Sequence, residues 1–398
     1  MTTAREARFR GAAAVVGVGE TQLYRRGDSP RSSMQLAAEA VINACRDAGV
    51  DPRQVDGFAS YGHDSNEGLL LGAHLGVDEV RWSSMVWGGG GGGVGAAINA
   101  AAAAVASGQA DCVVVFRSIT QQDDGRGSYY RDHMGPLLTS NAVFSPAQIC
   151  GLRSQRMFEV DQVPVEAMEA ITLASYHHAQ RNPKAVAFGK PLGAEEYRGS
   201  REVSSPFRIF DCSRENDGAA ALLVVPSEHV DRYRGAPAYV LGGVQGSGPD
   251  WSESIENEAA YSSAGFHPAL VERLWLSAGV TPADVDVVQV YENFTGPSVA
   301  SMIDFGLCRA GPNATDVLNF ENLIVEGGSL PINTAGGNIA EGFVHGINLA
   351  VEAVRQIRGG SPNPVAEASA SLLIGGPMAP LVSATVFGSS PDGAANRG

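Results

Sequence analysis

The chain alternates short apolar runs with longer stretches in which apolar residues recur at helical spacing. One run, 112–116, is apolar without interruption, which is typical of a strand covered on both faces. Such strands, alternating with helices, predict an α/β fold. We expect strands at 12–19, 55–60, 83–87, 112–116, 217–225, 239–243, 285–291, 370–374 and 381–387, and helices at 34–47, 66–75, 94–107, 165–181, 268–278, 296–305 and up to about 358.

One segment of the chain is repeated. AGVDPRQVDGF at 48–58 returns, altered, as AGVTPADVDVV at 278–288. In both copies a helix ends at a glycine, which can adopt the left-handed conformation, and the proline that follows cannot continue the helix. A strand-like run comes after each copy. The repeat favours two related halves, residues 1–230 and 231–398, over a coincidence in a common turn.

The stretch 118–210 interrupts this rhythm inside the first half, whose core we place at 12–117 and 211–230. It is polar, rich in arginine and tyrosine, and has one clear helical pattern at about 165–181. Excursions of this length are usually functional or disordered. We therefore expect a long insertion over one face of the core.

The charge and the cysteine content narrow the classes of partner, metal site and location that the chain can have. A formal net charge of −15 over 398 residues argues against nucleic acid and anionic membranes as partners, although a local basic patch could hold one anionic ligand. No apolar run reaches the roughly 18–20 residues of a membrane helix, and Met1–Arg10 lacks the apolar region of a signal peptide. Five scattered cysteines without metal-binding spacing predict reduced thiols, no metal site and a cytoplasmic location.

The run WGGGGGGVGAA at 87–97 joins a predicted strand to a predicted helix. Such a junction brings backbone amides and the positive end of a helix to one point, which suits an anionic or oxyanionic group. The run matches neither the phosphate-loop motif nor a dinucleotide-binding fingerprint. A close helix–sheet contact that needs small residues is the alternative.

The segment YENF at 291–294 ends a predicted strand, so its side chains emerge at the carboxyl edge of the sheet, where ligand sites of α/β proteins concentrate. Tyr291, Glu292 and Asn293 offer a phenol, a carboxylate and an amide. A hydrogen-bonded strand end is the structural alternative.

The segment NTAGGNIAEGFVHG at 333–346 reads as a glycine-rich loop leading into a helix. Glu341 and His345 are four residues apart, which predicts that they share one helix face. His345 is a catalytic candidate, with a structural histidine as the alternative.

Four motifs in this order resemble the signatures of the thiolase superfamily: DGAAALLV at 217–224, YENF, GGNIAEG at 336–342 and LLIGG at 372–376. The chain is most similar to the sterol-carrier-protein type of thiolase. The resemblance spans nearly the whole chain and implies a duplicated αβαβα layered core with a long loop-domain insertion. It also implies a homodimer that pairs through the core.

The departures from the thiolase pattern remove its nucleophile. Thiolases carry a reactive cysteine where this chain has the glycine run, and no cysteine lies between Cys45 and Cys112. Tyr291 replaces the usual histidine or asparagine of the strand-end motif. Phe343 stands at the position of the loop histidine, and Leu373 at that of the second cysteine. Covalent acyl transfer has therefore lost both its nucleophile and its activator.

This pattern resembles the thiolase-like steroid side-chain-cleaving aldolases, the lipid-transfer-protein group. The resemblance implies retro-aldol cleavage of a β-hydroxyacyl-CoA steroid, such as a 17-hydroxy C22-acyl-CoA, to a ketosteroid and propionyl-CoA. It also implies that no cofactor is tightly bound and that CoA is part of the substrate. The implied partner is a small zinc-ribbon and OB-fold domain, often attached to a steroid enoyl-CoA hydratase, in a heterotetramer. That group also implies a second tyrosine near the glycine-rich loop, and this chain has no tyrosine after Tyr291.

For this reaction we assign Tyr291 to proton transfer, with His345 as its leading partner and Glu292 and Asn293 as further candidates. Amides near Gly89 and Gly376 would cradle the thioester oxygen, each such donor being worth about 3 kcal/mol. The segment 201–214 and the arginines of the insertion are candidates for holding CoA phosphates. These arginines are Arg117, Arg126, Arg131, Arg153 and Arg156.

Two other functions remain open. One is acyl transfer between CoA esters within a multi-subunit thiolase-like complex, against which the missing cysteines weigh. The other is a non-catalytic acyl-CoA carrier or scaffold, against which the polar residues grouped at the site argue.

Overall fold

The computed structural model describes residues 9–62, 64–87, 90–120, 135–247, 263–379 and 381–393. Within them, ten strands form one mixed sheet in the order β10-β11-β12-β9-β1-β8-β5-β3-β4, with β2 paired to β8. The strands are β1 (Ala13–Glu20), β2 (Tyr24–Arg25), β3 (Gly57–Tyr61), β4 (Trp82–Val86), β5 (Val113–Ile119), β8 (Asn216–Pro226), β9 (Ala238–Gly246), β10 (Val287–Val290), β11 (Ala370–Gly375) and β12 (Val382–Gly388).

The sheet consists of two groups of strands that meet at a short seam. In the first group β3 is parallel to β4 and β5, whereas β8 is antiparallel to β5 and β1. In the second group β10 is parallel to β11, and β12 is antiparallel to β11 and β9. The seam pairs only Ala14 with Tyr239 and Val15 with Ala238. The chain leaves the first group after β8 and enters the second at β9.

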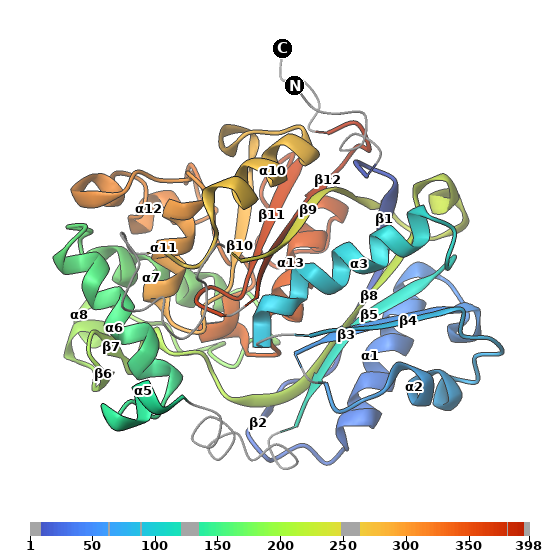
Figure 1. Ribbon diagram of the computed structural model, residues 1–398, viewed down its shortest axis with the longest axis horizontal. Helices are drawn as coiled ribbons and strands as arrows, with labels where there is room; N and C mark the ends of the chain where they lie inside the picture. The colour runs from blue at the N-terminus through green and yellow to red at the C-terminus, as the bar shows by residue number, and fades with distance from the viewer. Residues whose placement is uncertain are drawn as a thin grey trace.

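Helices lie between the two groups of strands and on their outer faces (Figure 1). The buried helices α3 (Val94–Ala106) and α13 (Ile347–Arg358) contact strands of both groups. The outer helices are α1 (Ser33–Ala48) and α2 (Gly68–Leu75) on the first group, and α10 (Pro268–Ala278) and α11 (Thr295–Asp304) on the second. The predicted thiolase-like αβαβα layering is confirmed. The division into halves near residue 230 stays a prediction.

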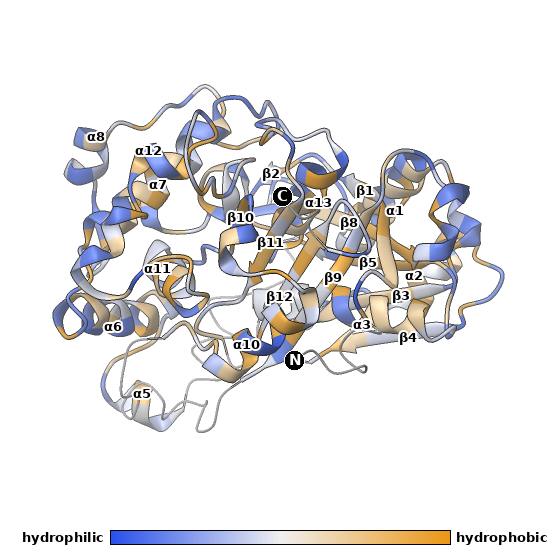
Figure 2. Cartoon of the chain, turned by 90° about the horizontal axis from the view of Figure 1, so that it is seen from above, coloured by the Kyte–Doolittle hydropathy of each residue, from blue (hydrophilic) through white to orange (hydrophobic). Residues whose placement is uncertain are grey.

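The repeated segment forms the same local structure twice. Helix α1 ends at Gly49 with φ 72°, and α10 ends at Gly279 with φ 68°. A short 3-10 turn follows each, Pro52–Gln54 and Pro282–Asp284. These turns lead into β3 and β10. Figure 2 shows strongly apolar colouring along the central strands, as burial on both faces requires.

The insertion gathers beside α11, as the contacts of α11 with α6 and α7 show (Figure 1). It contains α5 (Pro136–Ser140), α6 (Pro146–Glu159), α7 (Glu166–Ala179), α8 (Ala194–Gly199), β6 (Glu202–Ser204) and β7 (Phe207–Arg208). The expectation of one clear helix was therefore wrong. Helix α6 was missed because its buried positions include Cys150, Gly151, Arg153 and Ser154, which do not form an apolar stripe. Among the described residues, no helix is both long and apolar enough to span a membrane.

Candidate active site

Tyr291 follows β10 and lies buried against two glycines. Its amide donates to the carbonyl of Ile374 at 3.0 Å, and the residue is 4% exposed. A Cβ added at Gly91 would lie 1.8 Å from Cε2 and 2.1 Å from Cζ of the Tyr291 ring. A Cβ at Gly346 would lie 2.7 Å from Cδ2. The phenol therefore occupies the space that a side chain at either position would need.

The rest of the glycine run is packed just as closely. A Cβ at Gly92 would lie 1.7 Å from the carbonyl oxygen of Leu381, and one at Gly93 would lie 2.5 Å from Cβ of Tyr61. Gly376, with φ +67°, would place a Cβ 2.0 Å from Cα of Gly92. Gly376 thus lies beside the glycine run that precedes α3, and its role as an amide donor stays a prediction. Gly89 lies outside the described residues, so its role stays a prediction.

His345 does not lie on a helix, and the predicted helix face shared with Glu341 is wrong. A π-helical turn, Gly337–Glu341, ends at Gly342 with φ 156°, and α13 begins only at Ile347. His345 itself has φ 50° and precedes Gly346 with φ 84°. Glycine conformations on both sides break the helix that residue spacing alone suggested.

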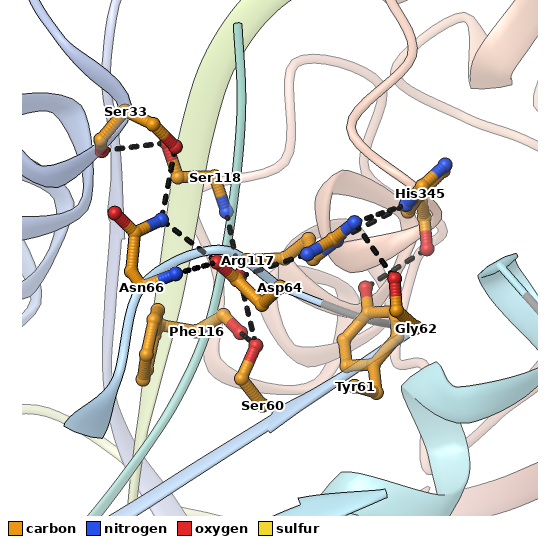
Figure 3. Close-up of polar contacts among 10 residues, drawn as sticks. All are labelled: Ser33, Ser60, Tyr61, Gly62, Asp64, Asn66, Phe116, Arg117, Ser118 and His345. Carbon is orange, nitrogen blue, oxygen red and sulfur yellow. Dashed lines mark hydrogen bonds and ion pairs between the residues drawn. The ribbon is translucent and has the colours of Figure 1, made fainter. Parts of the chain in front are cut away.

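Arg117 binds the imidazole of His345 (Figure 3). Nε and Nη2 of Arg117 lie 3.0 Å and 2.9 Å from Nδ1 of His345. Nη1 pairs with Oδ2 of Asp64 at 3.0 Å, and Nη2 also donates to the carbonyl of Gly62 at 3.1 Å. Arg117 is 4% exposed, and its guanidinium group is already bound to partners inside the protein. The expectation that Arg117 binds CoA phosphates is therefore wrong.

Tyr61 is a second buried tyrosine at the site. Its hydroxyl donates to the carbonyl of His345 at 2.8 Å, and its ring lies 5.8 Å from Cζ of Arg117. Burial raises the pKa of Tyr61 well above its usual value. Sequence reasoning missed Tyr61, although the repeat contains the signal: counted from the start of each copy, Tyr61 and Tyr291 occupy the same position.

Phe343 lies between Tyr291 and His345. Its ring is edge-to-face with that of Tyr291, the centroids 6.0 Å apart, and edge-to-face with that of His345 at 5.1 Å. The structure therefore brings together Tyr291, His345, Gly376 and the glycine run. Tyr291 and His345 share an aromatic neighbour.

Glu292 turns toward the glycine-rich loop. Its Oε1 accepts from the hydroxyl of Ser175 at 2.8 Å, and its Oε2 accepts from the amide of Asn338 at 2.8 Å. Burial raises the pKa of Glu292 to about 7, although these hydrogen bonds oppose the shift. This carboxyl can therefore change its charge near neutral pH.

Asn293 turns toward the insertion. Its Nδ2 lies 3.8 Å from Sγ of Cys150, and its Oδ1 accepts from the amide of Phe294 at 2.9 Å. The structure thus ties Asn293 to α6. The catalytic roles assigned to Glu292 and Asn293 stay predictions.

The other arginines that were expected to hold CoA phosphates lie in different surroundings. Arg126 and Arg131 lie outside the described residues, and Arg153 is only 6% exposed. Arg214 lines a cavity of about 300 Å³ together with Lys190, Tyr176 and Phe210. Of the candidates for CoA phosphates, Arg214 is thus one that faces a cavity.

Four of the five cysteine thiols are poorly suited to nucleophilic attack. Burial raises the pKa of Cys45, Cys212 and Cys308 to about 12, and raises that of Cys112 further. A nucleophilic cysteine needs the opposite shift. Across the described segments, no three His, Cys, Asp or Glu side chains are grouped so that they could hold a metal ion.

The sequence is similar to a family model and to several known proteins. Residues 256–386 match the family model described as "Thiolase C-terminal domain-like". The chain is 34% identical over 382 residues to a 17-hydroxy-3-oxo-4-pregnene-20-carboxyl-CoA lyase of Mycobacterium tuberculosis, covering 93% of this chain and 97% of that protein. It is 31% identical to a steroid side-chain-cleaving aldolase of Thermomonospora curvata, covering 93% and 96%.

The fold also matches a solved structure. It superimposes on the Ltp2-ChsH2(DUF35) aldolase with a TM-score of 0.87 and 30% identity, covering 96% of this chain and 98% of the matched chain.

Proposed function

This chain belongs to the thiolase superfamily, and we propose that it is a carbon–carbon lyase that cleaves a steroid side chain by a retro-aldol reaction. The substrate would be a β-hydroxyacyl-CoA, best represented by a 17-hydroxy steroid C22-acyl-CoA. Two relatives named for this chemistry, each matched over more than nine-tenths of its length, support the proposal.

One structural observation supports the proposal. The ring of Tyr291 fills the space above Gly91 that a side chain at that position would need. A covalent acyl-enzyme requires a nucleophile, and the glycine run supplies none. A retro-aldol reaction requires only proton transfers and stabilisation of an enolate.

The proposed reaction balances without a further reactant. A base removes the proton of the 17-hydroxyl group, and the bond between C17 and the α-carbon of the thioester breaks. The electron pair of that bond passes into the thioester as an enolate, and the hydroxyl becomes a ketone. Protonation of the α-carbon then yields propionyl-CoA.

Tyr291 is the proposed proton-transfer residue. An unperturbed phenol has a pKa of about 10 and needs neighbouring groups to act as a base near neutral pH. The start of α3 and the amides near Gly89 and Gly376 are suited to the oxygen of the enolate. Glu292 holds the amide of Asn338 and so supports the glycine-rich loop.

The proposed assembly is a homodimer with a DUF35-type partner, which we equate with the zinc-ribbon and OB-fold domain expected from the sequence. Strand β4 is the last strand of the sheet order and leaves an edge for pairing. Met85, Trp87, Leu69 and Leu70 around it are 40%, 78%, 58% and 52% exposed. Large exposed apolar side chains beside an open edge favour a protein interface. The match to the Ltp2-ChsH2(DUF35) aldolase supports the partner.

The test is product analysis by mass spectrometry. The chain, co-expressed with its DUF35-type partner, receives a 17-hydroxy steroid C22-acyl-CoA. We expect a 17-ketosteroid and propionyl-CoA in equal amounts, and both formed at least 10²-fold more slowly by Tyr291→Phe. Substrate that binds but remains intact would contradict the proposed lyase and favour a carrier. Transfer of the acyl group to another CoA would favour acyl transfer.

A further inference from the structure

We propose that the cavity beside Arg214 is a binding site for a small monocarboxylate with an apolar body, separate from the site around Tyr291. The cavity has a volume of about 300 Å³ and is lined by residues of α7, of α8 and of the segments that follow these helices. Neither Tyr291 nor Gly376 is among the described residues that line it. Its lining includes Tyr176, Lys190, Leu192, Glu196, Phe210 and Arg214.

Three side chains with hydrogen-bond donors line this cavity. Nη2 of Arg214 donates to the hydroxyl of Tyr176, so the oxygen of that hydroxyl accepts and its own proton is left for another partner. Neither this proton nor Nη1 of Arg214 meets an acceptor among the described residues. Nζ of Lys190 makes one long contact, 3.5 Å, with the carbonyl of Val186. A carboxylate only accepts hydrogen bonds and has room for all three donors.

Two of these donors are held in place by the protein itself. Nε of Arg214 donates to the carbonyl of Ile339 at 3.1 Å, and its backbone amide donates to the carbonyl of Asn338 at 3.0 Å. The guanidinium carbon of Arg214 lies 5.8 Å from the ring centre of Tyr176, a residue that is 2% exposed. Burial raises the pKa of Tyr176 above its usual value, although Arg214 opposes the shift, so the hydroxyl keeps its proton at neutral pH. Donors that are fixed in advance lose little entropy when a ligand binds.

The charges around the cavity favour a ligand with one negative charge. The chain has a formal net charge of −15, yet Lys190 and Arg214 outnumber Glu196 in the lining of this cavity. The excess is a single positive charge, which one carboxylate neutralises. A phosphate monoester carries about −1.5 to −2 at neutral pH and would leave negative charge beside Glu196. The cavity therefore suits a carboxylate better than the CoA phosphates that the sequence suggested for Arg214.

The rest of the lining suits an apolar body. The rings of Phe210 and Tyr176 meet edge to face with their centroids 5.6 Å apart. Val186, Pro191 and Leu192 complete this part of the cavity. Small-molecule sites typically combine such walls with a few polar groups in volumes of about 300–1,000 Å³. Because a cavity of about 150 Å³ holds a benzene molecule, a cavity of about 300 Å³ has room for a body of two rings.

The chain contains only two lysines, so a ligand can be followed at one of them. Lys190 lines the cavity, whereas Lys184 pairs with Glu20 at 3.2 Å and does not line it. In protein labelled with 13C-lysine, 2-naphthylacetate should move the Cε signal of Lys190, with a Kd of about 1 mM or tighter, and leave that of Lys184 in place. The neutral 2-naphthylacetamide should move neither signal. An unmoved Lys190 signal, or equal movement with both compounds, would overturn the proposal.

Two variants test the donors by isothermal titration calorimetry. Tyr176→Phe removes only the hydroxyl, and Lys190→Gln removes a charge at an exposed position. Each should weaken the binding of 2-naphthylacetate about tenfold or more, as expected when a hydrogen bond to a charged group is lost. Lys184→Gln is the matched control and should leave the affinity unchanged. Unchanged affinity in either folded cavity variant would refute the set of donors, and Lys190→Gln decides alone if Tyr176→Phe does not fold.

Two further ligands distinguish a carboxylate site from a phosphate site. Inorganic phosphate should bind at least about tenfold more weakly than 2-naphthylacetate, and CoA should not displace the carboxylate. Tighter binding of phosphate, or displacement by CoA, would overturn the proposal and return Arg214 to the phosphates of the substrate. None of these measurements depends on cleavage of a steroid. Failure of the carboxylate site therefore leaves the proposed lyase activity standing, and absence of cleavage leaves the carboxylate site standing.

Discussion

Replacing Gly91 with alanine should disturb the site far more than one methyl group does elsewhere. The new Cβ would lie 1.8–2.6 Å from three atoms of the Tyr291 phenol, so the ring or the turn must move. Overpacking of this kind costs about 1–3 kcal/mol. Gly91 is not in a left-handed conformation, so alanine also gains about 0.4–1 kcal/mol by restricting the unfolded chain. The expected net loss is about 1–2 kcal/mol.

The measurement is a double-mutant cycle by urea denaturation. Gly91→Ala is compared in the natural chain and in Tyr291→Val, which removes the ring. If the ring causes the cost, Gly91→Ala should become neutral or stabilising in the second background, a coupling of about 1–3 kcal/mol. Gly199→Ala is the control, because nothing lies within 4 Å of a Cβ at that position. An equal cost of Gly91→Ala in both backgrounds would refute the argument that Tyr291 requires this glycine.

Three further predictions concern the phenol, the buried carboxyl and the exposed edge. Tyr291→Phe should lower turnover by about 10²- to 10⁴-fold, the range for lost acid–base catalysis, with urea stability within about 1 kcal/mol; normal turnover in a product assay would remove Tyr291 from the mechanism. The pKa of Glu292 is raised from 4.5 to about 7 by burial, so its contribution to stability is full below about pH 4.5 and is lost as pH rises through about 7. Glu292→Gln should therefore show a shallower fall in urea midpoint over this range, and an identical slope would contradict the shift. Met85→Lys on β4 should convert the proposed homodimer to monomers in analytical ultracentrifugation, whereas Val160→Lys, at the exposed residue just after α6, should not.

The strands and helices of the core follow from local patterns. Uninterrupted apolar runs predicted strands such as β5, and the glycine and proline of each repeat predicted where α1 and α10 end. These signals are local because hydrogen bonding and burial of regular elements repeat along the chain. Helix α6 escaped because tertiary contacts, rather than an apolar stripe, bury its polar residues.

The candidate site was predicted less completely because its contacts join distant segments. Tyr291 and Gly376 were identified from motifs, but Arg117 and His345 lie 228 positions apart, so no local pattern could reveal their hydrogen bond. The four-residue spacing of Glu341 and His345 predicted a helix face that Gly342 and Gly346 prevent. The environment of Arg117 likewise depends on Asp64, which precedes it by a whole βαβ unit. The burial of these side chains and their hydrogen-bond partners therefore could not be predicted from the sequence.

The repeat explains why two tyrosines pack against one glycine run. It also shows how the surroundings of their hydroxyl groups differ. Tyr61 and Tyr291 occupy equivalent strand ends, and their side chains pack on Gly93 and Gly91 respectively. The hydroxyl of Tyr61 is engaged by the carbonyl of His345, and burial raises its pKa further from neutrality. A phenol so engaged supports the loop that carries His345. We therefore propose Tyr291, rather than Tyr61, for proton transfer. The glycines are needed on both sides because each repeat brings a ring to them.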